Sequence, residues 1–106
     1  MVNKNFYKAF NRGWNKLFEE LLAELEQYDA EIAEAKEKYG TLTVYAYSEI
    51  NGEEVQKIID EYEEKSKHTC ELCGDKGEMR TIQVDWLKVL CDVCLEKVEA
   101  ERISSL

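Results

Sequence analysis

The sequence predicts an α+β protein in which a helical scaffold is followed by a small four-cysteine module. Three observations predict this class: helical spacing of apolar residues in the first third, an alternating strand pattern after Gly40, and two C-x-x-C pairs near the end. We expect the scaffold to span residues 1–66 and the module residues 67–106, joined as one compact unit. A chain of 106 residues fits a single domain, and so short a chain gains stability from a bound metal or a partner.

The first predicted element is a long helix over about residues 11–39, or two helices end to end. Apolar side chains recur at steps of three and four, the period of a helix, at Phe6, Phe10, Trp14, Leu17, Leu21, Leu25, Tyr28, Ile32, Ala35 and Tyr39. Gly13 costs about 1 kcal/mol inside a helix, so we expect the helix to begin or bend there. Gly40 suits the position after a helix, and the lysines just before it suit the negative helix end.

One strand and a second helix follow in the predicted order. In TLTVYAYS, apolar and polar side chains alternate, which predicts a strand over residues 41–48. Asn51 precedes Glu54 by three residues, as in a capping box, which predicts a helix start. The second helix is expected over residues 52–66, and its buried face would be made by Val55, Ile58, Ile59 and Tyr62.

The cysteine module is predicted to contain a knuckle, a β-hairpin and a C-terminal helix. The knuckle is CELCG, two short strands lie on either side of Asp85, and the helix begins at the second cysteine pair. This order is typical of a treble-clef zinc finger. A zinc ribbon is the alternative, in which the second cysteine pair would lie on a second knuckle.

The cysteines have the spacing C-x2-C-x17-C-x2-C, which is typical of a four-thiolate metal site. Zn²⁺ prefers four tetrahedral ligands, and a closed set of four thiolates marks a structural site rather than a catalytic one. We therefore expect one structural Zn²⁺ held by Cys70, Cys73, Cys91 and Cys94. A redox-active set of thiols and an iron–sulfur cluster are the alternatives. The only histidine, His68, is expected to lie beside the site as an incidental neighbour or as a hydrogen-bond partner of a ligand, and its replacement of one cysteine as a ligand is the alternative.

The chain is acidic, and its charge is unevenly distributed. The formal net charge is -9, and residues 19–64 contain 15 acids and 3 bases, whereas residues 1–18 contain four bases and no acid. No apolar stretch approaches the roughly 20 residues of a membrane span, and the first residues lack the features of a secretion signal. We therefore expect a cytoplasmic protein of a bacterial host cell, where reducing conditions disfavour structural disulfides.

The acidic middle of the chain is a candidate surface for binding a basic protein. Electrostatic attraction would steer such a partner and tyrosines would anchor it, whereas an ordinary solvated surface and core packing are the alternatives. The candidate partner-binding residues are Glu24, Glu31, Glu34, Tyr45, Tyr47, Glu61 and Glu64. A different candidate surface is a row of bases that would contact phosphates if it lined a helix, namely Lys4, Lys8, Arg12 and Lys16.

Four segments carry a resemblance to a known family. They are GW at 13–14, KEKYGTLTVY at 36–45, SKHTCELCG at 66–74 and WLKVLCDVC at 86–94. Together they resemble a family of small uncharacterised phage and bacterial zinc-binding proteins with the pattern KEK[FY]G-x-L, then S-x-x-TCExCG, then LCDxC. Tyr39 stands where that family usually has phenylalanine, and Thr43 where a basic residue is common. The resemblance implies a phage or mobile-element setting and brings no established activity.

These observations favour a protein that acts by binding rather than by catalysis. The sequence contains no serine–histidine–acid arrangement at a supported spacing and no phosphate-cradling glycine loop. We expect an inhibitor or adaptor of anti-CRISPR-like kind that engages a basic, nucleic-acid-handling host protein through an acidic surface. The alternative is a zinc-finger nucleic-acid-binding or transcription accessory protein. Direct nucleic-acid binding and membrane association are not expected, and a dimer is compatible with the sequence.

Overall fold

The computed structural model describes residues 4–8, 10–83 and 86–104. Its helical elements are the 3-10 segments η1 (Lys4–Lys8) and η2 (Arg12–Trp14) and the helices α1 (Asn15–Leu25), α2 (Gly52–Ser66) and α3 (Asp92–Ser104). Its strands are β1 (Glu31–Lys38), β2 (Thr41–Tyr47), β3 (Glu78–Gln83) and β4 (Trp86–Leu90). The predicted α+β class is confirmed, and the strand after Gly40 and the helix over residues 52–66 are confirmed as β2 and α2.

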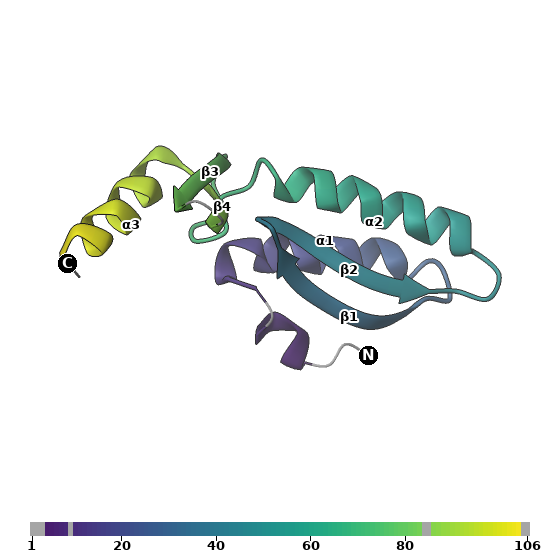
Figure 1. Cartoon of the computed structure of the whole chain (residues 1–106). Helices are drawn as coiled ribbons and strands as arrows, with labels where there is room; N and C mark the ends of the chain where they lie inside the picture. Colours follow the sequence, from purple (N-terminus) through teal and green to yellow (C-terminus); the bar gives the residue numbers. More distant parts are fainter. Residues whose placement is uncertain (1–3, 9, 84–85, 105–106) are drawn as a thin grey trace.

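The two hairpins lie at different places in an elongated molecule. Strands β1 and β2 form one antiparallel pair and β3 and β4 another. Figure 1 shows α2 running along the first hairpin with α1 behind it, and the second hairpin and α3 at one end of the molecule. The principal extents of 52 × 23 × 22 Å reflect this arrangement. The division of the chain between residues 66 and 67 stays a prediction.

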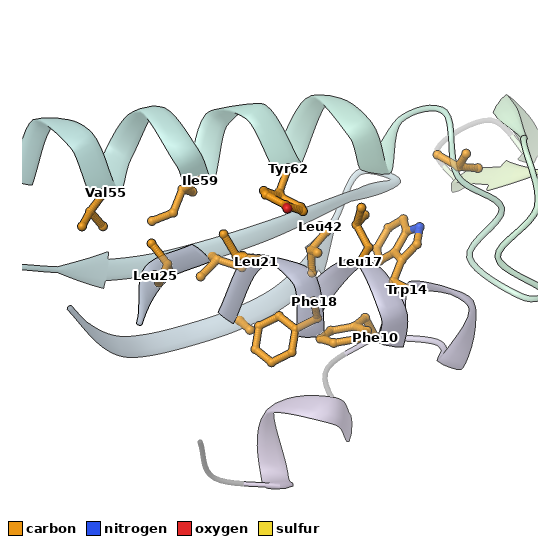
Figure 2. Packing of buried hydrophobic residues seen from close by; sticks show 13 residues of the cluster. Phe10, Trp14, Leu17, Phe18, Leu21, Leu25, Leu42, Val55, Ile59 and Tyr62 are labelled. Atoms are coloured by element: carbon orange, nitrogen blue, oxygen red, sulfur yellow. The ribbon is translucent and has the colours of Figure 1, made fainter. Parts of the chain in front are cut away.

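The main core lies between α1, α2 and the first hairpin (Figure 2). Helix α1 buries one face because its apolar side chains recur at three- and four-residue steps, and Trp14 just before it is also fully buried. Phe10 and Phe18 pack edge to face with ring centroids 5.2 Å apart. Burial of each such side chain contributes about 1.5–3 kcal/mol, so this cluster supplies much of the stability of the scaffold.

The predicted long helix over residues 11–39 is wrong, and so is the expectation of a single strand after it. Helix α1 ends at Leu25, and β1 then pairs antiparallel with β2 from Glu31 opposite Tyr47 to Lys38 opposite Thr41. The segment EIAEAKEK is therefore a strand, although glutamate, alanine and lysine favour helices. Pairing with β2 and packing on the core outweigh this local preference.

A β-bulge explains why the strand has the apolar spacing of a helix. The register shifts between Ile32 and Glu34, so Ala33 is an extra residue without a partner in β2. The side chains of Ile32 and Ala35 both pack toward the core although they are three residues apart. A regular strand would place inward side chains two or four residues apart, whereas three is a helical step. The bulge thus reproduces the pattern that predicts a helix.

The turn between β1 and β2 uses two residues with positive φ. Tyr39 has φ 52° and Gly40 has φ 80°, which is the pattern of a two-residue type I′ hairpin turn. Gly40 is therefore required by a hairpin and not by a helix end. A Cβ atom on Gly40 would also lie 2.6 Å from Sδ of Met79. The turn of the first hairpin thus packs directly against β3 of the second.

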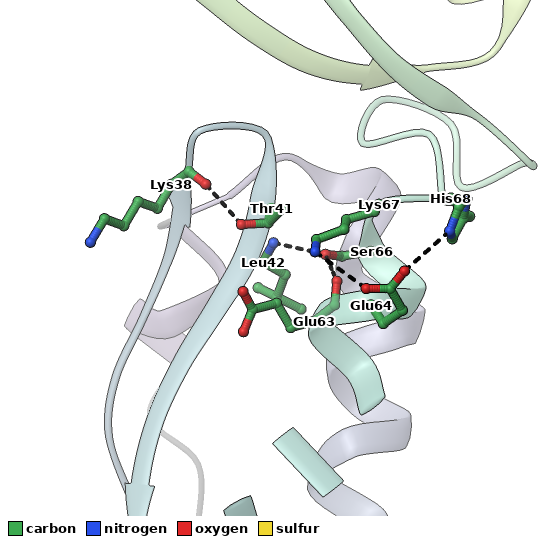
Figure 3. A network of polar contacts seen from close by, with 8 residues as sticks. All are labelled: Lys38, Thr41, Leu42, Glu63, Glu64, Ser66, Lys67 and His68. Carbon is green, nitrogen blue, oxygen red and sulfur yellow. Dashed lines mark hydrogen bonds and ion pairs between the residues drawn. The ribbon is translucent and has the colours of Figure 1, made fainter. Parts of the chain in front are cut away.

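A small polar network joins the C-terminal end of α2 to β2 (Figure 3). The Ser66 hydroxyl accepts a hydrogen bond from the Leu42 N–H at 2.9 Å and donates one to the Glu63 carbonyl at 2.5 Å. Ser66 is fully buried, so these bonds satisfy a polar group that would otherwise destabilise the core. The predicted capping box at the start of α2 is not formed, because the Asn51 side chain makes no cap hydrogen bond.

Among the described residues, no helix combines the length and the apolar composition needed to cross a membrane.

Replacement of Tyr39 by asparagine should stabilise the protein. Asparagine adopts positive φ more readily than tyrosine does, and the Tyr39 side chain is 72% exposed, so little packing is lost. We expect Tyr39→Asn to raise the free energy of unfolding in urea by about 0.5–1 kcal/mol. Tyr39→Phe keeps both the strain and the size and should leave the midpoint unchanged. A lower midpoint for Tyr39→Asn would show that the tyrosine ring stabilises the hairpin.

Candidate metal centre

The four cysteines converge from two parts of the chain. Cys70 and Cys73 lie in the knuckle between α2 and β3, Cys91 directly follows β4, and Cys94 lies in the first turn of α3. Their four Sγ atoms lie within 4.8 Å of one another, and those of Cys73 and Cys91 are 3.6 Å apart. A tetrahedral ion with bonds of about 2.3 Å would separate its sulfur ligands by about 3.8 Å. The four thiols therefore fit a metal ion.

Backbone hydrogen bonds shape the knuckle. The Cys70 carbonyl accepts a hydrogen bond from the Gly74 N–H at 2.9 Å, and the Cys70 N–H donates to the Asp75 carbonyl at 2.7 Å. Gly74 has φ 87°, a conformation that L-residues rarely adopt. The tight loop that results brings the thiols of Cys70 and Cys73 to the same side, as the two-residue gap between them predicts.

The second cysteine pair is held where β4 meets α3. The Cys94 N–H points at the Sγ atom of Cys91 at 3.4 Å, and the Leu95 N–H bonds the Cys91 carbonyl at 2.9 Å. Arg80 of β3 braces this junction, because its guanidinium bonds both the Leu90 carbonyl and the Asp92 carboxylate. The N-terminal end of α3 also places positive dipole potential near the thiols.

The thiols are unequal in acidity. Burial opposes ionisation of Cys70, but the backbone N–H groups of Cys91, Cys73 and Leu72 outweigh it and lower the pKa of Cys70 to about 7. Burial and the neighbouring thiols raise the pKa of Cys94 to about 12. For Cys73, the hydrogen bond to the Asp75 backbone is the largest single effect and lowers the pKa, but burial and the thiols of Cys70 and Cys91 together outweigh it and raise the pKa. Four adjacent thiolates repel one another, so a cation is needed to hold all four ionised.

The cysteine set has one apolar side and one accessible side. Cys70 and Cys94 are buried beside Ile82 and Leu90, in a cluster also packed by Leu72, Leu95 and Val98. Cys73 is exposed. A cluster this small stabilises little by itself, so a metal would contribute much of the stability of this end of the molecule.

The knuckle is attached to the scaffold through the dipeptide Gly13–Trp14. The Gly13 N–H donates to the Glu71 carbonyl at 2.8 Å, and the Trp14 indole N–H donates to the Thr69 carbonyl at 2.9 Å. A Cβ atom on Gly13 would lie 2.4 Å from the backbone oxygens of Cys70 and Glu71. Only glycine allows the two backbones to approach this closely. The close contact therefore explains why a glycine, which destabilises helical backbone, stands just before α1.

A buried carboxylate lies inside the knuckle. The Glu71 side chain is 1% exposed, and its Oε1 atom accepts hydrogen bonds from Lys88 at 2.6 Å and from Asn11 at 3.0 Å. A buried charge is tolerated only when it is paired in this way. Sequence reasoning missed Glu71, Lys88 and Asn11. The signal available in the sequence was the acidic residue that lies between the two cysteines of the first pair.

The seven candidate partner-binding residues come from two parts of the fold, the first hairpin and the helices α1 and α2. Glu31 lies opposite Tyr47 and Glu34 opposite Tyr45 on the outer face of the first hairpin. The Tyr47 hydroxyl bonds the Glu31 carboxylate at 3.4 Å.

The other three predicted residues lie on the helices. Burial raises the pKa of Tyr62, and so does the hydrogen bond that its hydroxyl donates to the Glu24 carboxylate, with a smaller effect of Glu61, so both glutamates lie near that ring. Glu64 pairs with Lys67 at 3.2 Å and with His68 at 3.5 Å. His68 therefore faces a carboxylate, and the candidate ligand group found in the described residues consists of the four cysteines.

The predicted helical row of bases is wrong as a continuous row. Lys8 ends η1 and Arg12 begins η2, and the two 3-10 segments are separated by nonhelical backbone at residues 10–11. The side chain of Lys4 lies outside the described side chains. Arg12 and Lys16 instead line a cavity of about 350 Å³ beside Cys73 and Gly74, together with the acids Glu20 and Asp75.

Replacement of Gly13 by alanine should destabilise the protein strongly. The added methyl group would meet backbone atoms of the knuckle, which cannot move aside as a flexible side chain can. We expect a loss of about 1–3 kcal/mol in the free energy of unfolding, measured by urea titration. Gly52→Ala is the matched control, since a Cβ atom there meets nothing within 4 Å and alanine favours the helix. Equal behaviour of the two variants would contradict the close contact.

Comparison with known proteins gave no match, since no protein-family model matches the sequence and no curated protein or solved structure is significantly similar to it. The family resemblance described above therefore stays an expectation.

Proposed function

We propose that the protein is a small non-enzymatic zinc protein that acts by binding a basic protein partner. The observation that carries the metal part is the convergence of four thiols within 4.8 Å. The observation that supports the binding part is an exposed face of tyrosines and glutamates on a chain with a net charge of -9. The metal would then stabilise the fold, and the first hairpin of the scaffold would present the partner-binding surface.

Zinc is the metal that this ligand set favours. Soft thiolate ligands select zinc or iron–sulfur clusters over hard cations, and a closed tetrahedral set is typical of structural zinc. The order of knuckle, hairpin and helix, with Cys94 inside α3, supports a treble-clef arrangement. In a zinc ribbon the second cysteine pair would lie on a second knuckle. Here Cys91 directly precedes α3 and Cys94 lies within that helix.

The outer face of the first hairpin supports a basic partner. Tyr45 and Tyr47 are 46% and 58% exposed, which is unusual for large aromatic side chains and typical of interface anchors. Glu31 and Glu34 lie directly across from them on β1. Carboxylates beside aromatic rings suit lysine and arginine, and the chain's own Lys36 is an example, since it pairs with Glu34 at 3.4 Å and lies 5.4 Å from the centre of the Tyr45 ring. A base of the partner would bind at Glu31 and Tyr47 or replace Lys36. The partner we propose is a basic, nucleic-acid-handling host protein, which the protein would inhibit in an anti-CRISPR-like manner.

The purified protein should contain one zinc ion per chain. We expect elemental analysis by mass spectrometry to give this stoichiometry. At a chelator concentration that leaves zinc bound to the wild type, Cys70→Ser should lose its zinc. His68→Ala should retain zinc as the wild type does, because His68 faces Glu64. Visible absorption from an iron–sulfur cluster, or loss of zinc in His68→Ala, would contradict the four-thiolate zinc site.

Charge reversal on the hairpin should abolish partner binding. We expect Glu31→Lys with Glu34→Lys to lose a basic protein that the wild type captures from host lysate, because the reversed face repels cations. Glu96→Lys with Glu99→Lys changes the net charge equally at exposed positions of α3 and should keep the partner. Loss in both variants, or in neither, would contradict binding at this face. A salt-sensitive gel shift that depends on Arg12 and Lys16 would favour nucleic-acid binding instead.

A further inference from the structure

A cavity of about 480 Å³ opens between the end of α1 and the start of β1. Apolar side chains from η1, α1, the following turn and β1 form one part of its lining, at Phe6, Leu22, Leu25, Tyr28 and Ile32. The volume lies within the range of sites that hold a ligand group or a large side chain. Leu25 is buried, while Leu22, Tyr28 and Ile32 are half-buried, so an apolar surface remains open to a further group.

The rim of this cavity is acidic. Glu26, Asp29 and Glu31 are all exposed and line it, and none of the described lining residues is basic. Among the described residues, none of these three carboxylates takes part in an ion pair. The cavity thus combines apolar side chains with three carboxylates that form no ion pair within the described part of the chain.

The position of these carboxylates is unfavourable for the isolated fold. The C-terminal end of a helix carries partial negative charge and is stabilised by bases, whereas acids near it are destabilising. The last turn of α1 contains no base, yet Glu26 caps that end and Asp29 follows in the turn. Folding alone gives no reason for this arrangement, and a bound cation would remove its cost.

We propose that this cavity receives a large apolar side chain of the protein partner, flanked in the partner sequence by lysine or arginine. This inference rests on the proposed function and names the partner segment more closely. The apolar walls would bury the side chain, and the rim would bind the flanking bases. Glu31 belongs to the rim and also bonds the Tyr47 hydroxyl, so the cavity is continuous with the tyrosine face.

Two synthetic peptides test the cavity without an identified partner. Both have two arginines on each side of a central residue, which is phenylalanine in one and serine in the other, and binding to the full chain is followed by fluorescence anisotropy. We expect the phenylalanine peptide to bind about tenfold more tightly, because only its ring gains from the apolar walls. Equal affinity of the two peptides would overturn the proposal.

Two variants separate the walls from the rim. Ala30→Trp would fill the cavity from its lining while keeping every carboxylate, so it should abolish the preference for phenylalanine. Glu26→Gln with Asp29→Asn should weaken both peptides about threefold or more and reduce their salt dependence. Glu96→Gln with Glu99→Gln is the matched control and should leave both affinities unchanged. Circular dichroism would confirm that each variant folds. A preference that persists in Ala30→Trp would overturn the proposal.

The outcomes distinguish this inference from the proposed function. If Ala30→Trp captures the basic partner as the wild type does, while Glu31→Lys with Glu34→Lys loses it, the cavity proposal fails and the proposed function stands. If the peptides bind through the cavity but host lysate yields no basic partner, the cavity proposal is supported and the proposed function fails.

Discussion

The close backbone contact between Gly13 and the cysteine knuckle is the constraint on which the rest of the structure depends. The same loop that carries Cys70 and Cys73 accepts hydrogen bonds from the Gly13 amide and the Trp14 indole. Trp14 is also fully buried in the scaffold core. The start of the first helix and the candidate metal centre are therefore fixed to each other directly. A change in the geometry of the thiols would be transmitted to the core through this contact.

Strand β4 connects the two hydrophobic clusters. Successive side chains of a strand point to opposite faces, and Val89 belongs to the scaffold cluster while Leu90 belongs to the cluster under the cysteines. The preceding residue, Lys88, pairs with the buried Glu71 in the knuckle. One short strand thus contributes to the core, to the thiol cluster and to the buried ion pair. This shared strand explains how a small chain can support two clusters that are each modest in size.

The sequence predicted the elements whose pattern lies within a short stretch of the chain. The alternation in β2, the apolar face of α2 and the paired cysteines are each visible within a few residues, and all three lie where the sequence places them. The strand β1 was missed because its bulge and its composition both imitate a helix. The contacts of Asn11 and Gly13 with Glu71 span about 60 residues, and no periodicity carries information over that distance.

The helix-like composition of β1 has a consequence for solubility. Within the described part of the chain, β1 pairs with β2 alone, so its other edge presents backbone groups without a described partner strand. Such an edge can recruit a strand from another molecule and begin aggregation. In EIAEAKEK, five of eight side chains are charged, and the bulge twists the strand locally. The charged residues and the bulge that make β1 resemble a helix in the sequence are therefore the features that keep neighbouring molecules from extending the sheet.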